Sequence, residues 1–236
     1  KGMIKIWQSI RALGFYTGLV LLVVLMLSVL CMVGFLPFRY RQLCVTSGNR
    51  LLMRWLQFTC GVRIKVRGLE NIPTSACVVL SNHQSTWETF FLQYLLVPAS
   101  MILKRELLWI PLFGWGLYSM RAIAIKRSNP AGAIRQVLKQ GKQRLSQGIN
   151  VVIFPEGTRI RTGEVGTFMT SGAALAKSAG VQILPVRHDA GHCWPANSWL
   201  KTPGTINLVI GPLIDTAEAK PRELTEQAHK WIANAL

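Results

Sequence analysis

The hydrophobic residues of this chain follow three successive patterns. Residues 12–38 contain no charged side chain, and residues 19–27 are apolar throughout. Residues 39–60 mix leucines and aromatic residues with arginines, and after Gly61 short apolar runs alternate with amphipathic stretches. This succession predicts an apolar helix, then a basic amphipathic helix, then a domain of strands and helices. We therefore expect two parts, residues 1–60 and residues 61–236.

The first pattern is long enough for a membrane anchor. As one helix, residues 12–38 would extend about 40 Å, more than the roughly 30 Å hydrocarbon core of a bilayer. A signal peptide fits less well, because the apolar stretch is too long and no Ala-x-Ala-type cleavage site follows it. Basic residues flank the segment on both sides. A helical hairpin that enters one leaflet and turns near Gly34 and Pro37 therefore fits as well as a span.

Residues 39–60 allow two interpretations. Leucines and aromatic residues set among arginines are typical of a helix that lies at an anionic membrane interface. The same pattern is typical of an amphipathic helix packed on the domain that follows it. The sequence does not separate these two placements.

The third pattern predicts an α/β domain. The expected strands are residues 62–66, 76–80, 100–103, 122–125, 151–154, 181–186 and 205–210. The expected helices are residues 86–96, 107–118, 130–147, 171–179 and 221–235. Alternation of this kind indicates a mixed, partly parallel sheet flanked by helices. In such sheets, function gathers at the carboxyl ends of the strands.

The charge of the chain indicates an anionic partner. The formal net charge is +17, and ten Lys and Arg precede the first acidic residue, Glu70. The basic residues flank an apolar stretch, which favours an anionic phospholipid membrane over nucleic acid. The five cysteines form no close pair and show no metal-ligand spacing. They indicate reduced thiols, and therefore a catalytic part that faces the cytoplasm.

A histidine and a carboxylate follow the second expected strand. His83 and Glu88 lie five residues apart in the segment Asn82-His83-Gln84-Ser85-Thr86-Trp87-Glu88. On one helix they would point about 140° apart, so they meet only if His83 precedes the helix and Glu88 lies in its first turns. Ser85 or Thr86 could cap that helix. A carboxylate that orients a histidine makes it a general base, so we expect His83 and Glu88 to be catalytic.

Candidate phosphate ligands follow three other strands. Pro155-Glu156-Gly157-Thr158-Arg159 comes after the strand at 151–154, and its hydroxyl, guanidinium and backbone N–H groups suit a phosphate. Lys104 and Arg127 lie just past the strands at 100–103 and 122–125. The expected binding residues are therefore Glu156, Gly157, Thr158, Arg159, Lys104 and Arg127.

Two further segments have simpler interpretations. Ile183-Leu184-Pro185-Val186 is a strand interrupted by proline, which suggests an edge strand or a wall beside the site. His188, Asp189, His192 and Cys193 carry metal-ligating groups, but nearby Gly191 and Pro195 favour a loop. We expect no metal.

These elements, in this order and spacing, resemble the glycerolipid acyltransferases, most closely the bacterial lysophosphatidate acyltransferases. The family's first motif is Asn-His, four residues and Asp, and its third motif appears unbroken from Phe154 to Arg159. Residues 104–127 are similar to the second motif, and Leu184-Pro185-Val186 to the fourth. The resemblance covers roughly residues 62–213, and the apolar segment is similar to the family's membrane anchor.

The resemblance implies acyl transfer from acyl-CoA or acyl-carrier protein to the sn-2 hydroxyl of lysophosphatidic acid, without a cofactor. It also implies a bacterial inner membrane location for the anchor and an acyltransferase domain at residues 61–236. The alcohol itself is the nucleophile, so a Ser85 acyl-enzyme is poorly supported.

The chain departs from the family pattern at two positions. Glu88 replaces the usual Asp and is one methylene longer, so the helix entry must adjust. The family often has an aromatic residue and then Lys after the third motif, where this chain has Phe168 and Met169. If that Lys holds an anionic group, Arg161 or Lys177 would have to substitute for it. Another lysophospholipid or lyso-aminolipid acceptor therefore stays open, and so does a non-enzymatic basic membrane-binding protein.

Overall fold

The computed structural model describes residues 2–236 except 112 and 127, and for residues 2–4 it describes the backbone alone. Its helices are α1 (Gly2–Val33), α2 (Phe38–Cys60), α3 (Trp87–Leu95), α4 (Phe113–Ser119), α5 (Pro130–Ser146), α6 (Ser171–Ala179) and α7 (Pro221–Asn234). Its strands are β1 (Val62–Arg67), β2 (Val78–Ser81), β3 (Ala99–Lys104), β4 (Ile123–Ile125), β5 (Asn150–Ile153), β6 (Ile183–His188) and β7 (Gly204–Ile210). Each expected strand is present, with ends that differ by one or two residues.

The strands form one mixed sheet in the order β1-β7-β6-β2-β5-β3-β4. Neighbouring strands are parallel throughout except for β6 and β7, which are antiparallel. Five strands, from β6 to β4, therefore run in one direction and end at one edge. The predicted mixed, partly parallel α/β sheet flanked by helices is confirmed.

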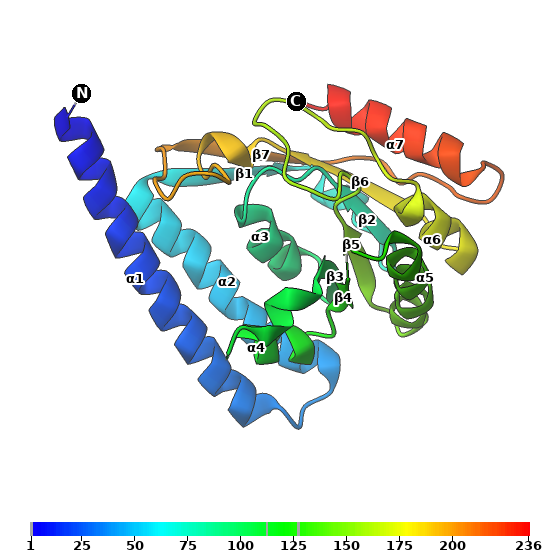
Figure 1. Ribbon diagram of the computed structural model, residues 1–236, viewed down its shortest axis with the longest axis horizontal. Coiled ribbons are helices and arrows are strands. Elements are labelled where there is room, and N and C mark those ends of the chain that lie inside the picture. Colours follow the sequence, from blue (N-terminus) through cyan, green and yellow to red (C-terminus); the bar gives the residue numbers. More distant parts are fainter. Residues whose placement is uncertain (1, 112, 127) are drawn as a thin grey trace.

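Helices cover both faces of the sheet (Figure 1). One face packs against α1, α2 and α3, and the other packs against α5, α6 and α7. Successive residues of β2 alternate between these cores, with Val79 in the first and Val78 and Leu80 in the second. A strand buried on both faces has no polar side to present, which explains the continuous apolar run in its sequence.

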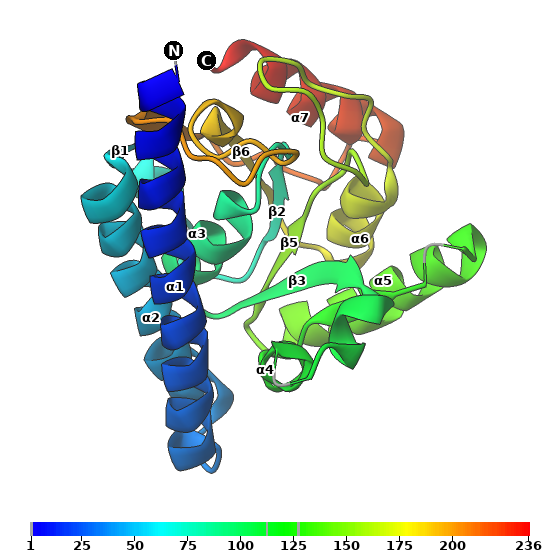
Figure 2. The same cartoon turned by 60° about the vertical axis from the view of Figure 1, so that its left-hand side comes forward.

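The N-terminal helices form a hairpin that lies against the domain (Figures 1 and 2). The chain turns between α1 and α2 at residues 34–37, as Gly34 and Pro37 predict. Within α1, the segment Lys5–Val33 is long and apolar enough to cross a membrane. Helix α2 buries one side against α1 and α3, so it packs on the domain, and Gly61 ends it in a left-handed conformation with φ 68°.

One local expectation is wrong, and one of two alternatives is excluded. The helix expected at 107–118 begins as a 3₁₀ helix, η2 (Arg105–Trp109), and continues only from Phe113 as α4. Pro111 explains the break, because proline disfavours helical backbone in the residue before it. Of the two alternatives for the proline-interrupted strand, the edge strand is excluded because β6 lies between β7 and β2, whereas a wall beside the site is compatible with His188 of β6 lying 4.0 Å from Glu88. Pro185 donates no hydrogen bond there, but its carbonyl accepts the N–H of Gly211 at 2.9 Å.

Candidate active site

The candidate site lies where β2, β5, β3 and β6 end. The register pairs Leu80 with Ile153 and Ser81 with Val186. His83 and Glu156 each follow their paired residue by three positions, so they leave the sheet at the same level. Parallel strands with one shared edge thus bring together segments that are about 70 residues apart in the sequence.

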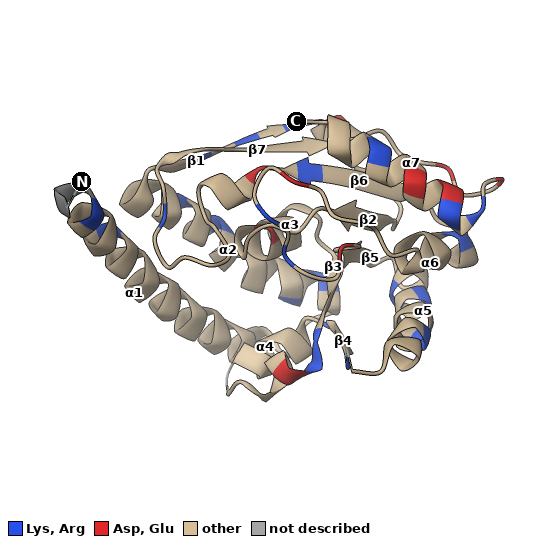
Figure 3. Ribbon diagram, turned by 45° about the horizontal axis from the view of Figure 1, so that its top comes forward, with Lys and Arg blue, Asp and Glu red and all other residues tan. Residues whose placement is uncertain are grey.

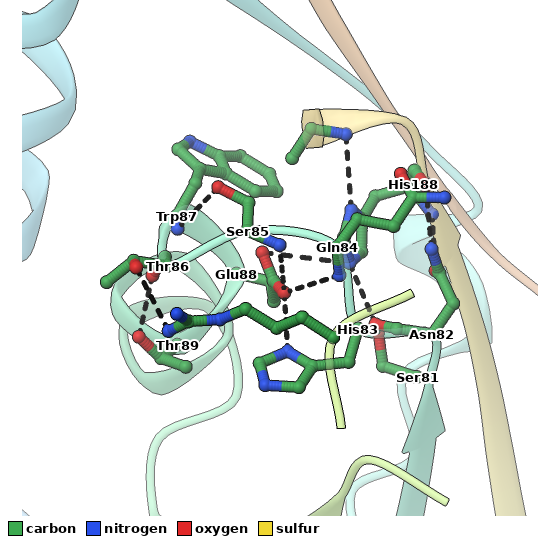
Figure 4. Close-up of polar contacts among 12 residues, drawn as sticks. Ser81, Asn82, His83, Gln84, Ser85, Thr86, Trp87, Glu88, Thr89 and His188 are labelled. Carbon is green, nitrogen blue, oxygen red and sulfur yellow. Dashed lines mark hydrogen bonds and ion pairs between the residues drawn. The ribbon is translucent and has the colours of Figure 1, made fainter. Parts of the chain in front are cut away.

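His83 and Glu88 meet directly (Figure 4). His83 lies in the loop before α3 and Glu88 in the first turn of that helix. The distance from His83 Nδ1 to Glu88 Oε1 is 2.7 Å. The same oxygen accepts the backbone N–H groups of Gln84 at 3.0 Å and Ser85 at 2.8 Å. The loop therefore wraps around the carboxylate, which accommodates the extra methylene of Glu.

The Glu88 carboxyl is fully buried yet ionised. Burial raises its pKa, but interactions with His188 and His83 and the hydrogen bond from the Ser85 N–H outweigh burial. The pKa of Glu88 therefore lies below its ordinary value. A buried carboxylate hydrogen-bonded to Nδ1 keeps the Nδ1–H tautomer of His83, which leaves Nε2 free to accept a proton. The His83 side chain is 13% exposed, so substrate can reach it.

His188 forms a second buried layer that the sequence did not reveal as part of the site. Its Nε2 donates to the Asn82 carbonyl at 2.9 Å, and its Nδ1 accepts the Ala190 N–H at 3.3 Å. Both ring nitrogens are thus used in the neutral form, and burial lowers the His188 pKa despite the nearby Glu88. The Asn82 side chain donates to the His188 carbonyl at 2.9 Å and accepts its N–H at 3.0 Å. Asn82 therefore fixes the loop that carries His83 to β6.

Glu156 holds the His83 backbone. Its Oε2 accepts the N–H of His83 at 2.6 Å, and its Oε1 accepts the N–H of Gly166 at 2.9 Å. The His83 carbonyl accepts the N–H of Ile160 at 2.8 Å. Burial raises the pKa of Glu156, although both N–H donors oppose that effect. Both carboxylate oxygens thus contact backbone groups, and the hydrogen bonds described for Glu156 include none to Arg159.

Four of the other expected ligands lie at or just after the ends of β5 and β3. Gly157 turns the chain with φ 69° after β5, and the exposed Thr158 and Arg159 follow it. Arg159 Nη2 donates to Thr86 Oγ1 at 3.0 Å, which ties the guanidinium to the residue that precedes α3. Lys104 is exposed at the end of β3, beside β5. Arg127 lies outside the described residues.

Three other side chains do not join the site. Lys177 was one of two alternatives, with Arg161, for the role of the missing lysine, but its Nζ donates to the carbonyls of residues 216, 217 and 219 at 3.4, 3.2 and 2.9 Å. Ser85 is buried, and its Oγ accepts the N–H of Trp87 at 3.1 Å. Asp189 accepts the backbone and side-chain N–H groups of Asn207. In the described part of the chain, no three His, Cys, Asp or Glu residues gather as metal ligands.

The arrangement provides a general base, an anion site and an apolar cleft. The partly exposed His83 ring stacks on Phe154 with centroids 4.3 Å apart, and Arg159 is hydrogen-bonded to Thr86 of the same loop. A cleft of about 100 Å³ lies between α1, α2, α3 and α4, and Phe90 and Gln93 of α3 are in its lining. These two residues lie on the same helix as Glu88, two and five positions beyond it, or about half a turn and one and a half turns. The site can therefore deprotonate a hydroxyl on a molecule that also has an anionic group and an apolar chain.

Comparisons with known proteins place the chain in a family. The family model described as acyltransferase matches residues 63–189. The 1-acyl-sn-glycerol-3-phosphate acyltransferase of Pseudomonas aeruginosa is 48% identical over 205 residues, covering 85% of this chain and 80% of the relative. The human 1-acyl-sn-glycerol-3-phosphate acyltransferase alpha is 31% identical over 176 residues, covering 74% of this chain and 60% of the relative.

A solved structure agrees with these relatives. The crystal structure of the 1-acyl-sn-glycerophosphate acyltransferase from Thermotoga maritima matches with a TM-score of 0.83 at 25% identity. The match covers 98% of this chain and 95% of that one. The matched family model contains His83, Glu88 and the segment from Phe154 to Arg159. From the family model, the relatives and the shared fold together, we conclude that this chain belongs to the acyltransferase family.

Proposed function

We propose that this protein transfers a fatty acyl group from an acyl thioester to the sn-2 hydroxyl of 1-acyl-sn-glycerol-3-phosphate, giving phosphatidic acid. The donor is acyl-CoA or acyl-carrier protein. The observation that carries this proposal is the pairing of His83 with the buried Glu88 at 2.7 Å, in a loop whose Thr86 accepts a hydrogen bond from Arg159. The named activities of the relatives support the same reaction.

His83 acts as a general base and then as a general acid. Its Nε2 takes the proton of the sn-2 hydroxyl while the hydroxyl oxygen attacks the thioester carbonyl. Glu88 stabilises the imidazolium through Nδ1–H. When the tetrahedral intermediate collapses, the C–S bond breaks and Nε2 returns the proton to the leaving thiolate. The new ester and a free thiol are the products, and the enzyme regains its starting protonation state.

Arg159 and Lys104 bind the phosphate of the acceptor. Arg159 offers a planar guanidinium whose orientation is already held by Thr86, and Thr158 and Lys104 add a hydroxyl and an ammonium. Guanidinium pairs well with phosphate oxygens, because two N–H groups match two acceptors. A phosphate bound at one end and a base at the other would aim the hydroxyl at the thioester. We assign Arg127 to the same phosphate site on the basis of its position in the sequence, just past β4.

The apolar cleft between α1, α2, α3 and α4 receives the acyl chain. Its lining is mostly leucine, methionine and phenylalanine, and it begins on the helix that carries Glu88. Water released from such surfaces favours the burial of an acyl chain there.

The exposed apolar face of α1 places the enzyme at a membrane. Large hydrophobic side chains are exposed along α1, among them Ile6, Leu13, Leu21 and Met32. A helix that exposes so many large hydrophobic side chains is more stable in contact with lipid than with water. The chain's basic charge favours an anionic leaflet, and its five cysteines are all free thiols. We therefore propose the cytoplasmic face of the bacterial inner membrane.

An acceptor screen tests the reaction. Purified protein is given radiolabelled acyl-CoA with lysophosphatidate, with lysophosphatidylethanolamine or with no acceptor, and labelled lipid is separated. We expect labelled phosphatidic acid with lysophosphatidate alone. Equal labelling of the ethanolamine lipid would move the assignment to another lysolipid acceptor. Absence of labelled lipid with every acceptor and with both thioester donors would contradict an acyltransferase.

A further inference from the structure

A basic groove lies apart from the His83 site, between the α1–α2 turn, β4 and α5. It has a volume of about 1070 Å³ and is open to solvent on one side. Five cationic side chains line it, namely Arg41, Arg105, Arg121, Lys139 and Arg144. Figure 3 shows basic residues on α5 and on the segment between β3 and α4. Among the described residues that line this basic groove, none is acidic.

Two arginines of the groove, Arg41 and Arg144, are held in place by backbone carbonyls. Arg41 donates to the carbonyls of Gly34 and Ser119, both at 3.1 Å, while its buried Nε has no hydrogen-bond partner among the described residues. Arg144 Nε donates to the Arg121 carbonyl at 3.2 Å. Burial lowers the Arg144 pKa, and the positive charge of Arg121 lowers it further.

None of the five forms an ion pair with a carboxylate in the described part of the chain. Like charges this close repel one another, and an anion from outside the chain would relieve that repulsion. The groove therefore has the electrostatics of an anion site.

An apolar wall distinguishes this groove from a site for a free anion. Leu30 and Gly34 of the hairpin, with Leu108 and Tyr118, form one side of it. Large apolar side chains are exposed on the same elements and the residue after η2, namely Val24, Leu25, Met32, Phe35, Trp109, Ile110, Trp115 and Tyr118. The hairpin turn and α4 lie on the same side of the molecule in Figures 1 and 2. Cations beside a partly apolar lining, on elements that also expose large hydrophobic side chains, match a ligand that has an anionic head and apolar tails.

We propose that the basic groove binds the headgroup of an anionic bilayer phospholipid, whose acyl chains lie along the exposed apolar side of the hairpin. This lipid is neither acceptor nor product of the acyl transfer, so the site goes beyond the proposed function. It would fix the depth and orientation of the enzyme on an anionic leaflet. Acyl-CoA also combines phosphates with an apolar chain, so it is the competing occupant, and donor kinetics separate it from a bilayer lipid.

Two matched double variants test the proposal. Arg105→Gln with Lys139→Gln removes two exposed cations from the groove, whereas Arg135→Gln with Lys142→Gln removes two exposed cations of α5 that do not line it. Each pair removes one arginine and one lysine. The readout is co-sedimentation of the full chain with phosphatidylcholine vesicles that contain or lack phosphatidylglycerol.

We expect the groove pair to weaken binding to anionic vesicles about 30-fold, from about 1 kcal/mol for each basic residue at an anionic surface. The α5 control pair should weaken it less than about 3-fold, and both pairs should keep wild-type binding to neutral vesicles. Equal losses in the two pairs would mean diffuse attraction and overturn the site. Unchanged binding by the groove pair would overturn it as well.

Steady-state kinetics in nonionic micelles without anionic lipid test whether the groove binds the acyl donor instead of a bilayer lipid. The proposal expects an unchanged KM for acyl-CoA in the groove pair. A raised KM with unchanged vesicle binding would make the groove a donor site and overturn the proposal. Should the double variant lose its cooperative thermal transition, Lys139→Glu against Lys142→Glu repeats the comparison on single exposed residues.

Discussion

Replacing Glu88 with Gln separates the charge of the His83 partner from its shape. Glu88 Oε1 accepts three hydrogen bonds, from His83 Nδ1 at 2.7 Å and from the N–H groups of Gln84 and Ser85. A glutamine carbonyl at the same position can accept all three. The amide nitrogen would take the place of Oε2, which has no hydrogen-bond partner among the described residues and lies 4.0 Å from His188 Nε2. The loop around Glu88 should therefore keep its conformation.

The loss should appear in the chemical step. General base catalysis by a positioned side chain contributes about 10²–10⁴ to the rate. A neutral amide cannot stabilise the imidazolium that His83 forms in the transition state, so most of this factor should vanish. We expect kcat to fall about 10²–10⁴-fold, or about 2.7–5.4 kcal/mol of transition-state stabilisation. The KM for lysophosphatidate should stay near wild type, because Glu88 makes no contact with the phosphate seat.

The assay is steady-state release of free thiol from acyl-CoA in the presence of lysophosphatidate. Glu218→Gln is the matched control, because it makes the same substitution at an exposed position in the segment between β7 and α7. This variant should keep wild-type kcat. Thermal unfolding confirms that each variant is folded. A folded Glu88→Gln variant with kcat within about 3-fold of wild type would show that the carboxylate charge is not needed, and the reasoning would fail.

Other predictions concern the rest of the site. Arg159→Ala should raise the KM for lysophosphatidate about 10-fold or more with a smaller change in kcat, as expected for a charge-assisted phosphate contact, and an unchanged KM in steady-state kinetics would exclude that contact. Glu156→Gln replaces one of two acceptors with a donor that opposes the N–H of His83. We expect kcat to fall about 10-fold as that loop shifts, and retention of wild-type kcat would count against a positioning role. Burial raises the pKa of Cys77 to about 12, so at pH 8 only about one thiol in 10⁴ is ionised. Mass spectrometry after iodoacetamide treatment of the folded protein should show modification of the exposed Cys31 before Cys77, and the reverse order would refute this burial.

The fold was largely predictable because its signals are local. Apolar runs of four to seven residues separated by amphipathic stretches identify strands and helices from periodicity alone. The order of the strands is not a local property. Nothing in residues 183–188 shows that β6 is an interior strand, antiparallel to β7 and parallel to β2. Pro185 made an edge strand one of two alternatives, because proline has no N–H to donate. The sequence does not show that the Pro185 carbonyl accepts the Gly211 N–H instead.

The candidate site was predictable where it rests on short motifs. The spacing of His83 and Glu88 and their position after a strand were enough to expect that they meet. Contacts between distant segments were not predictable from spacing. The hydrogen bonds of Asn82 to His188 and of Glu156 to the His83 backbone join residues 106 and 73 positions apart. The sequence shows the residue types that can make such bonds, but only the folded sheet edge brings them together. Lys177 shows that proximity in sequence can also mislead. It lies close to the third motif in the sequence, but its ammonium binds backbone carbonyls such as that of Ala219.

The central claim is that His83 is the base of an acyl transfer to a lipid hydroxyl. The most direct measurement is the rate at which the His83→Ala variant forms labelled phosphatidic acid from labelled acyl-CoA and lysophosphatidate. The side chain is partly exposed and its backbone is held by Glu156, so the variant should fold and still bind vesicles. The account predicts a rate at least about 10³-fold below wild type. Turnover within about 3-fold of wild type by a folded, vesicle-bound variant would contradict it.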